Sequence, residues 1–345
     1  MSTVEAATRI PGRRRPALVA SLFGLGALLA LVVLLSIVVG TKGLPLGTVL
    51  DALLRFDPAN PDHLIVRQLR VPRTVAGLLV GAALGLAGTV IQGVTRNPLA
   101  DPGILGINAG AALCVVLGIS VFGIASLSGY VWFGLAGAAI AAVLVYAVGS
   151  LGRGGATPLK LALAGAALTA ALGSFTNAIL LTDTVAFDQF RFWQVGALTG
   201  RDATIVAQGL PFLLAGVALA LGLGRVLNGL SLGADVARAW GQNVVANRIV
   251  SAVAVVVLCG AATAMAGPIG FLGLTVPHIA RMITGPDYRW ILPYAMVLAP
   301  ILLLVADVLG RIVARPAEVQ AGIVTAVIGA PVFVALVRRR KLATL

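Results

Sequence analysis

The chain has 345 residues, of which 59% are hydrophobic and 11% charged, and a mean hydropathy of +1.03. A water-soluble domain carries about a quarter charged residues, so this composition excludes that class. The formal net charge of +13 would suit nucleic-acid binding, but the placement of the basic residues argues against it, as shown below.

Long apolar segments alternate with short polar ones along the whole chain. A helix needs about 20 apolar residues to cross a bilayer, and glycine and proline shorten some segments here. We therefore expect an all-α polytopic membrane protein with one transmembrane domain at 17–338, a tail at 1–16 and a tail at 339–345. The ten predicted spans are 17–40, 72–94, 103–119, 130–150, 160–182, 204–224, 243–266, 271–284, 290–310 and 322–338.

The basic residues predict how the spans are oriented. With the N-terminus in the cytoplasm, 16 of the 25 Lys and Arg residues fall on the inner side and nine on the outer side. Cytoplasmic loops carry an excess of Lys and Arg, so we expect both termini in the cytoplasm. The positive charge is then a topology signal, and we expect no nucleic-acid partner.

Two outer segments and one inner turn are predicted between the spans. The outer segment 41–71 contains a candidate surface helix near 46–56, and the outer segment 183–203 contains a short helix that re-enters the membrane. The small residues of 81–111 permit close helix packing. Asn97-Pro98 and Asp101-Pro102 then break the chain, because the residue before proline avoids the helical region.

Four segments carry a family resemblance. They are RVPR (70–73), GAALGLAGTVIQGVTRNPLADPGILGINAGA (81–111), GPIGFLGLTVPHIARMITGPDYR (267–289) and ADVLGR with GIVTAVIGAPVFVALV (306–311 and 322–337). Together they resemble the iron-siderophore and cobalamin permease family, FecCD, from about residue 17 to the end. The resemblance implies a ten-span permease subunit of a type II ABC importer in the bacterial inner membrane.

The same resemblance implies the partners. They are a second permease subunit, identical or paralogous, two cytoplasmic ATPase subunits, and an extracytoplasmic binding protein that delivers a metal chelate. The sequence contains no GxxxxGK[ST] loop to cradle phosphates. We therefore expect no enzyme activity and no cofactor in this chain, with ATP and magnesium bound by the partner ATPase.

The inner segment SLGADVARAWGQN (231–243) contains a short amphipathic pattern. Leu232, Val236 and Trp240 recur at i, i+4 and i+8 on one helix face, and Asp235 suits the first turn. The residues alone permit a helix lying on the lipid headgroups. The resemblance implies instead the coupling helix, near 231–241 and including Arg238, that docks on the ATPase.

Three arginines on the outer side have two interpretations. From the residues alone, Asp307 and Arg311 form an i, i+4 pair, and Arg70 and Arg73 are interfacial anchors around Pro72. The resemblance implies that Arg70, Arg73 and Arg311 receive acidic residues from the two lobes of the binding protein. For Arg311, pairing with Asp307 competes with docking.

The resemblance also places the transport pathway. It runs between the two permease subunits, along the fifth span and the short outer helix, where Phe190, Trp193 and Gly196 are candidates for an outer gate. The inner loop RGGATPLK (153–160) takes the place of a cytoplasmic gate, with Gly155 and Thr157 as candidates.

His278 and Arg281 lie in a glycine- and proline-rich apolar segment. A metal site, a catalytic base or a proton relay there would need further histidine or acidic residues, which the sequence scarcely offers, so we assign both residues a structural role. The other histidine is His63, and no HxxxH or HExxH pattern exists, so no metal site is expected. We also assign structural roles to Asn97, Pro98, Pro277 and Asp307. A chain without metal ligands would carry iron inside its chelator; a ferric siderophore is the first choice, and haem and cobalamin stay open.

Two other functions were considered. An ion-coupled secondary transporter needs acidic or histidine groups deep in the membrane, and Asp307 is the only deep acid, with Arg311 available to pair with it. An intramembrane serine protease could use Ser150 of GSLG (149–152), but that serine lies at a span end without a nearby histidine.

Overall fold

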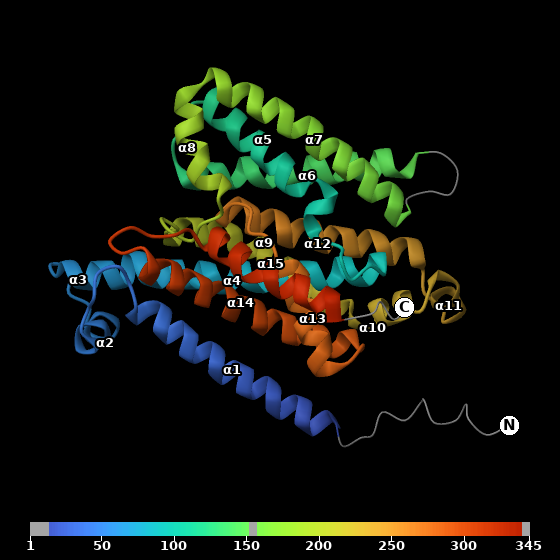
Figure 1. The fold of residues 1–345 in the computed structure, drawn as a ribbon, viewed down its shortest axis with the longest axis horizontal. Helices are drawn as coiled ribbons and strands as arrows, with labels where there is room; N and C mark the ends of the chain where they lie inside the picture. Colours follow the sequence, from blue (N-terminus) through green and yellow to red (C-terminus); the bar gives the residue numbers. More distant parts are fainter. Residues whose placement is uncertain (1–13, 152–156, 340–345) are drawn as a thin grey trace.

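The computed structural model describes residues 14–151 and 157–339, and this part of the chain is helical without any strand (Figure 1). The helices that correspond to the ten predicted spans are α1 (Arg14–Val38), α4 (Val71–Thr95), α5 (Ile107–Ser120), α6 (Leu127–Ser150), α7 (Pro158–Thr182), α9 (Ala203–Gly222), α12 (Val244–Ala266), α13 (Leu272–Thr284), α14 (Tyr288–Val313) and α15 (Ala321–Arg339). The connecting helices are α2 (Leu46–Leu54), α3 (Pro61–Leu64), the π-helix η2 (Ile65–Arg70), the 3₁₀ helix η3 (Pro102–Leu105), α8 (Thr184–Gln194), α10 (Gly224–Ser231) and α11 (Ala234–Ala239).

Helix lengths agree with a membrane-spanning fold. Seven of the described helical segments are long and apolar enough to cross a membrane, and in one of them α3, η2 and α4 run together as Pro61–Thr95. Helices α5, α13 and α15 are shorter. The two connecting helices predicted on the outer side are present as α2 and α8, whereas α10 was not anticipated as a separate helix.

Helix α4 lies at the centre of the bundle, with α12 and α14 packed against it. Most of α4 is buried, whereas α1 and α7 are largely exposed on opposite sides of the molecule (Figure 1). The end of the bundle with α2 and α3 lies opposite the end with α11. These two ends are the predicted outer and inner faces.

Close helix contacts depend on small residues, as predicted for the segment 81–111. A Cβ atom added to Gly81 would lie 2.6 Å from Cα of Pro300 on α14, and one added to Gly88 would collide with the backbone of Gly273 on α13. Lipid tails are as apolar as the helix side chains, so the hydrophobic effect does not drive membrane helices together, and they associate instead by such close backbone packing. Glycine at these positions therefore sets the distance from α4 to α14 and α13.

The chain is broken where the sequence predicted it, between α4 and α5. Arg96 is left-handed with a φ of 54°, the Asn97 carboxamide accepts from the Leu99 N–H at 2.9 Å, and the Asp101 carboxylate accepts from the Gly103 N–H at 2.8 Å. A second break separates α12 from α13, where Phe271 has a φ of 66°. Irregular backbone inside a membrane protein needs internal partners, and these side chains supply some of them.

Candidate functional site

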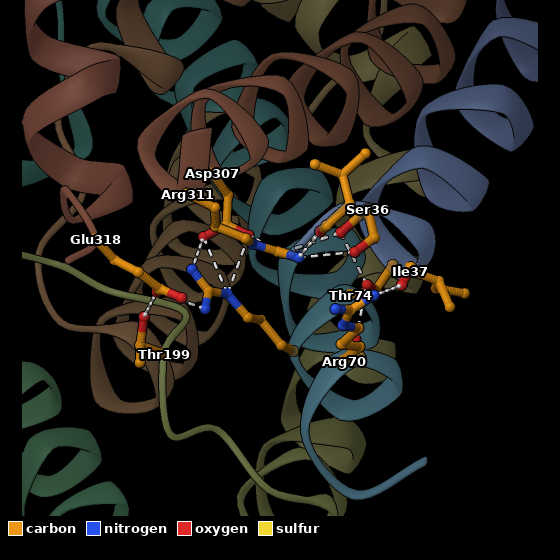
Figure 2. A network of polar contacts seen from close by, with 10 residues as sticks. Ser36, Ile37, Arg70, Thr74, Thr199, Asp307, Arg311 and Glu318 are labelled. Carbon is orange, nitrogen blue, oxygen red and sulfur yellow. Dashed lines mark hydrogen bonds and ion pairs between the residues drawn. The ribbon is translucent and has the colours of Figure 1, made fainter. Parts of the chain in front are cut away.

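A network of buried charged side chains lies at the predicted outer end of the bundle, the end that carries α2 and α3 (Figure 2). Asp307 of α14 is fully buried, and its carboxylate accepts hydrogen bonds from two guanidinium groups. Arg73, in the first turn of α4, donates from Nη2 to Oδ1 at 2.7 Å and from Nε to Oδ2 at 3.1 Å. Arg311, one turn after Asp307, donates to Oδ2 from Nε at 3.1 Å and from Nη2.

Each arginine of this network also has a second partner. Arg73 donates from Nη1 to Glu318 at 2.8 Å, and Glu318 accepts from the Thr199 hydroxyl at 3.0 Å. Arg311 donates from Nη1 to the carbonyl oxygens of Ser36 at 2.7 Å and Val39 at 3.0 Å. The network thus joins the start of α4, the ends of α1 and α14, and the segments before α9 and α15.

Arg70 binds the same end of α1. Its Nη1 donates to the carbonyl oxygens of Ile37 at 3.0 Å and Val38 at 2.6 Å. The last carbonyls of a helix have no partner within the helix, and cationic side chains satisfy them and offset the negative end of the helix dipole. Arg70 and Arg311 together therefore hold the C-terminus of α1 against α4 and α14.

The predicted i, i+4 pair of Asp307 and Arg311 is confirmed, and it is an internal ion pair. Arg70, Arg73 and Arg311 are exposed by only 5%, 9% and 1%. The contacts with a binding protein that the family resemblance implies must therefore form beside the hydrogen bonds within the chain or replace them. Sequence reasoning missed Ser36 and Glu318, because these partners lie far from the arginines along the chain and no local pattern links them.

The sequence predicted one short helix with Leu232, Val236 and Trp240 on a single face, and the structure corrects this: Val236 lies within α11, whereas Leu232 follows the end of α10 and Trp240 follows the end of α11. The three side chains are nevertheless exposed, by 59%, 39% and 62%, while Ala237 is buried against Leu230 and Val244. Arg238 donates to Asp235 at 2.6 Å on the surface. Gly233, with a φ of 118°, turns the chain from α10 into α11.

The candidate gate residues on α8 lie inside the subunit. Phe190 and Trp193 are buried and stack with ring centroids 5.6 Å apart. Gly196 has a φ of 74° and accepts from the Gly322 N–H at 2.9 Å, which ties the loop after α8 to the start of α15. The large hydrophobic side chains that α8 exposes are Val185, Phe187 and Phe192.

The remaining predicted residues are placed as follows. Gly155 lies outside the described residues, and Thr157 caps α7 by accepting from the Lys160 N–H at 3.3 Å.

Pro277 lies inside α13. His278 is buried, contacts the Leu274 carbonyl and lies 6.4 Å, edge to face, from the Phe333 ring of α15. Arg281 donates to the Tyr288 hydroxyl at 3.2 Å and lies over its ring.

An all-helical bundle with seven described helical segments of membrane-spanning length defines a multi-span membrane protein. Residues 28–339 match the FecCD transport family, and the chain belongs to it.

Two curated relatives and one solved structure illustrate the similarity. The chain is 47% identical over 318 residues to the ferric enterobactin transport system permease protein FepD of Escherichia coli, covering 92% of this chain and 94% of FepD. It is 41% identical to the iron(3+)-hydroxamate import system permease protein FhuB of Bacillus subtilis, covering 91% and 82%. A solved structure assigned to the metal-chelate type of ABC transporters, in an inward-facing conformation, superposes with a TM-score of 0.81 at 29% identity, covering 93% and 99%.

Proposed function

We propose that this chain is the transmembrane permease subunit of an ATP-driven ABC importer that carries a ferric siderophore, or a related metal chelate such as haem or cobalamin, into the cytoplasm. The relatives named above import ferric enterobactin and ferric hydroxamate, which favours the siderophore. The importer would contain a second permease subunit, two ATPase subunits and an extracytoplasmic binding protein. It would lie in a bacterial inner membrane with both termini in the cytoplasm.

The exposed face of α11 is the observation that carries the assignment of the ATPase partner. Leu232, Val236 and Trp240 place three exposed large apolar side chains within α11 and directly beside it, at the end of the bundle opposite the arginine network. A compact apolar patch at a predicted cytoplasmic surface is typical of a protein interface. In this proposal α11 transmits the movements of the ATPase to the permease helices.

Ion coupling is less compatible with the site. A coupling carboxylate must be able to release and rebind a proton or a cation. Asp307 is instead held by Arg73 and Arg311 and is fully buried. Its role is to neutralise two guanidinium groups.

The test is uptake of a labelled ferric siderophore into vesicles that contain the permease, its ATPase and its binding protein. Uptake must require ATP inside the vesicle and must persist without an ion gradient. Val236→Asp should remove the ATPase from the purified complex and abolish uptake. Val121→Asp, the same change at an exposed valine on the outer side, is the matched control and should keep both. Uptake driven by an ion gradient without ATP would contradict the proposal.

A further inference from the structure

A pocket of about 420 Å³ opens beside the arginine network at the outer end. Its walls come from the segment after α1, from η2, the start of α4, the segment before α9, the end of α14 and the segment between α14 and α15. The charged side chains that line it are Lys42, Arg70, Arg73, Arg201, Asp202, Arg311 and Glu318. Basic residues therefore outnumber acidic ones, and the pocket favours an anion.

Most of these basic residues already have partners within the chain. Lys42 pairs with Asp62 at 2.5 Å, and Arg73 and Arg311 share Asp307. Arg70 is held by main-chain carbonyls at the end of α1. Their hydrogen-bonding capacity is largely used in holding the helices together.

Arg201 is different, because it is buried without such partners. It is only 4% exposed, its Nε has no hydrogen-bond partner, and its side chain makes no hydrogen bond among the residues that the structure describes. The nearby Asp202 acts on it electrostatically, but the Asp202 carboxylate accepts from the Ile205 N–H at 2.9 Å and caps α9. The Arg201 guanidinium is therefore a buried cation of the pocket that is left to form its hydrogen bonds with another molecule.

The charge state of Arg201 suits an anionic partner. Burial lowers the pKa of the Arg201 guanidinium to about 10, and Asp202 opposes that decrease. The group is still protonated at neutral pH, where an unpaired buried guanidinium lowers the stability of the fold. A planar guanidinium binds a carboxylate through two parallel hydrogen bonds, which would remove that cost.

We propose that Arg201 receives an acidic side chain of the extracytoplasmic binding protein when that protein docks on the permease. This proposal rests on the proposed function. The pocket lies at the outer end, and neither α7 nor α8, where the pathway is predicted, contributes a residue to it. That position favours a docking protein over cargo in transit, and the excess of basic side chains complements a carboxylate.

The test measures the affinity of the binding protein for the permease–ATPase complex in nanodiscs, as a function of salt. Arg201→Met should raise Kd at least about tenfold, as expected when one partner of a close charge pair is removed, and should flatten the salt dependence. Gln68→Glu places a competing carboxylate at an exposed pocket position and should weaken docking as well. The control is Arg55→Gln, an exposed outer arginine that does not line the pocket, which should leave Kd unchanged.

The denaturation midpoint of the permease distinguishes a docking role of Arg201 from a purely architectural one. Because Arg201 is buried without a hydrogen-bond partner, Arg201→Met should keep or raise the denaturation midpoint of the permease. A lowered midpoint, with no effect of Gln68→Glu on docking, would show an architectural role and overturn the proposal.

Two other outcomes would also overturn it. One is an unchanged Kd for Arg201→Met. The other is unchanged docking with reduced uptake of an anionic chelate but not of a neutral one, which would make Arg201 a cargo contact. If the wild-type complex shows neither docking nor ATP-driven uptake, the proposed function itself fails.

Discussion

Replacing Asp307 with alanine should be among the most destabilising single changes at the outer end of the bundle. The carboxylate is fully buried and accepts from both Arg73 and Arg311. Without this carboxylate, two buried guanidinium groups lose the negative charge that neutralises them. Removing one partner of a buried ion pair costs about 3–5 kcal/mol. Arg73 keeps Glu318 and Arg311 keeps the carbonyl of Ser36, so we expect about 3 kcal/mol, the lower end of that range.

The assay is the free energy of unfolding in mixed micelles, measured for a small set of variants. Glu318→Gln is the comparison, because the Glu318 side chain is 22% exposed and forms its ion pair with Arg73; it should cost about 1 kcal/mol. Combining Asp307→Ala with Arg311→Met should cost less than the sum of the single changes, because one of the unpaired charges is then absent. If Asp307→Ala costs no more than Glu318→Gln, or if the double variant is additive, the network does not stabilise the fold as we describe.

Three further changes test other parts of the structure. Gly81→Ala should lower the free energy of unfolding by about 1–3 kcal/mol, because the new methyl group meets Pro300. Gly47→Ala is the control: Gly47 has open space around it, so this change should be neutral or stabilising. Equal effects of the two changes would contradict the packing argument. Arg70→Gln should speed hydrogen exchange at the C-terminal turn of α1, because the carbonyls there lose a donor, and an unchanged exchange rate would show that Arg311 suffices. Arg201 should make stability depend on pH in the alkaline range. Burial lowers its pKa in the folded protein to about 10, below its pKa in the unfolded chain, so the unfolded chain binds more protons between the two values. The wild-type protein should therefore gain stability relative to Arg201→Met as pH rises above about 10 and show a constant difference below it. A difference between the two proteins that varies around neutral pH would contradict that assignment.

The sequence was most informative where the physical signal is local. The apolar runs placed all ten predicted spans within a few residues of helices, from α1 through α15. The Asn97-Pro98 and Asp101-Pro102 pairs marked the break after α4, because proline restricts its own and the preceding residue. The i, i+4 spacing identified the Asp307–Arg311 pair. The spacing of Leu232, Val236 and Trp240 predicted exposed apolar residues at α11, but not that Gly233 separates Leu232 from that helix.

The sequence was least informative about residues whose partners lie on distant segments. Arg73 meets Glu318 across 245 positions, and Arg311 meets the end of α1 across 275. Nothing near Phe190 or Trp193 indicates that these rings face the core of the subunit, because an aromatic pattern on a short helix fits either face. Arg201 has no motif at all, and only its burial without a hydrogen bond distinguishes it.

The order of apolar and polar residues by itself determined that this chain is a bundle of membrane helices, where those helices begin and end, and which short helix carries an apolar surface. These features depend on neighbours within one or two turns, where backbone geometry and hydropathy are sufficient. Only the tertiary structure decided which charged groups are neutralised inside the bundle and which one is left for a partner. The physical reason is that the electrostatic state of a buried charge depends on the groups packed around it, and the fold brings those groups together from segments hundreds of residues apart.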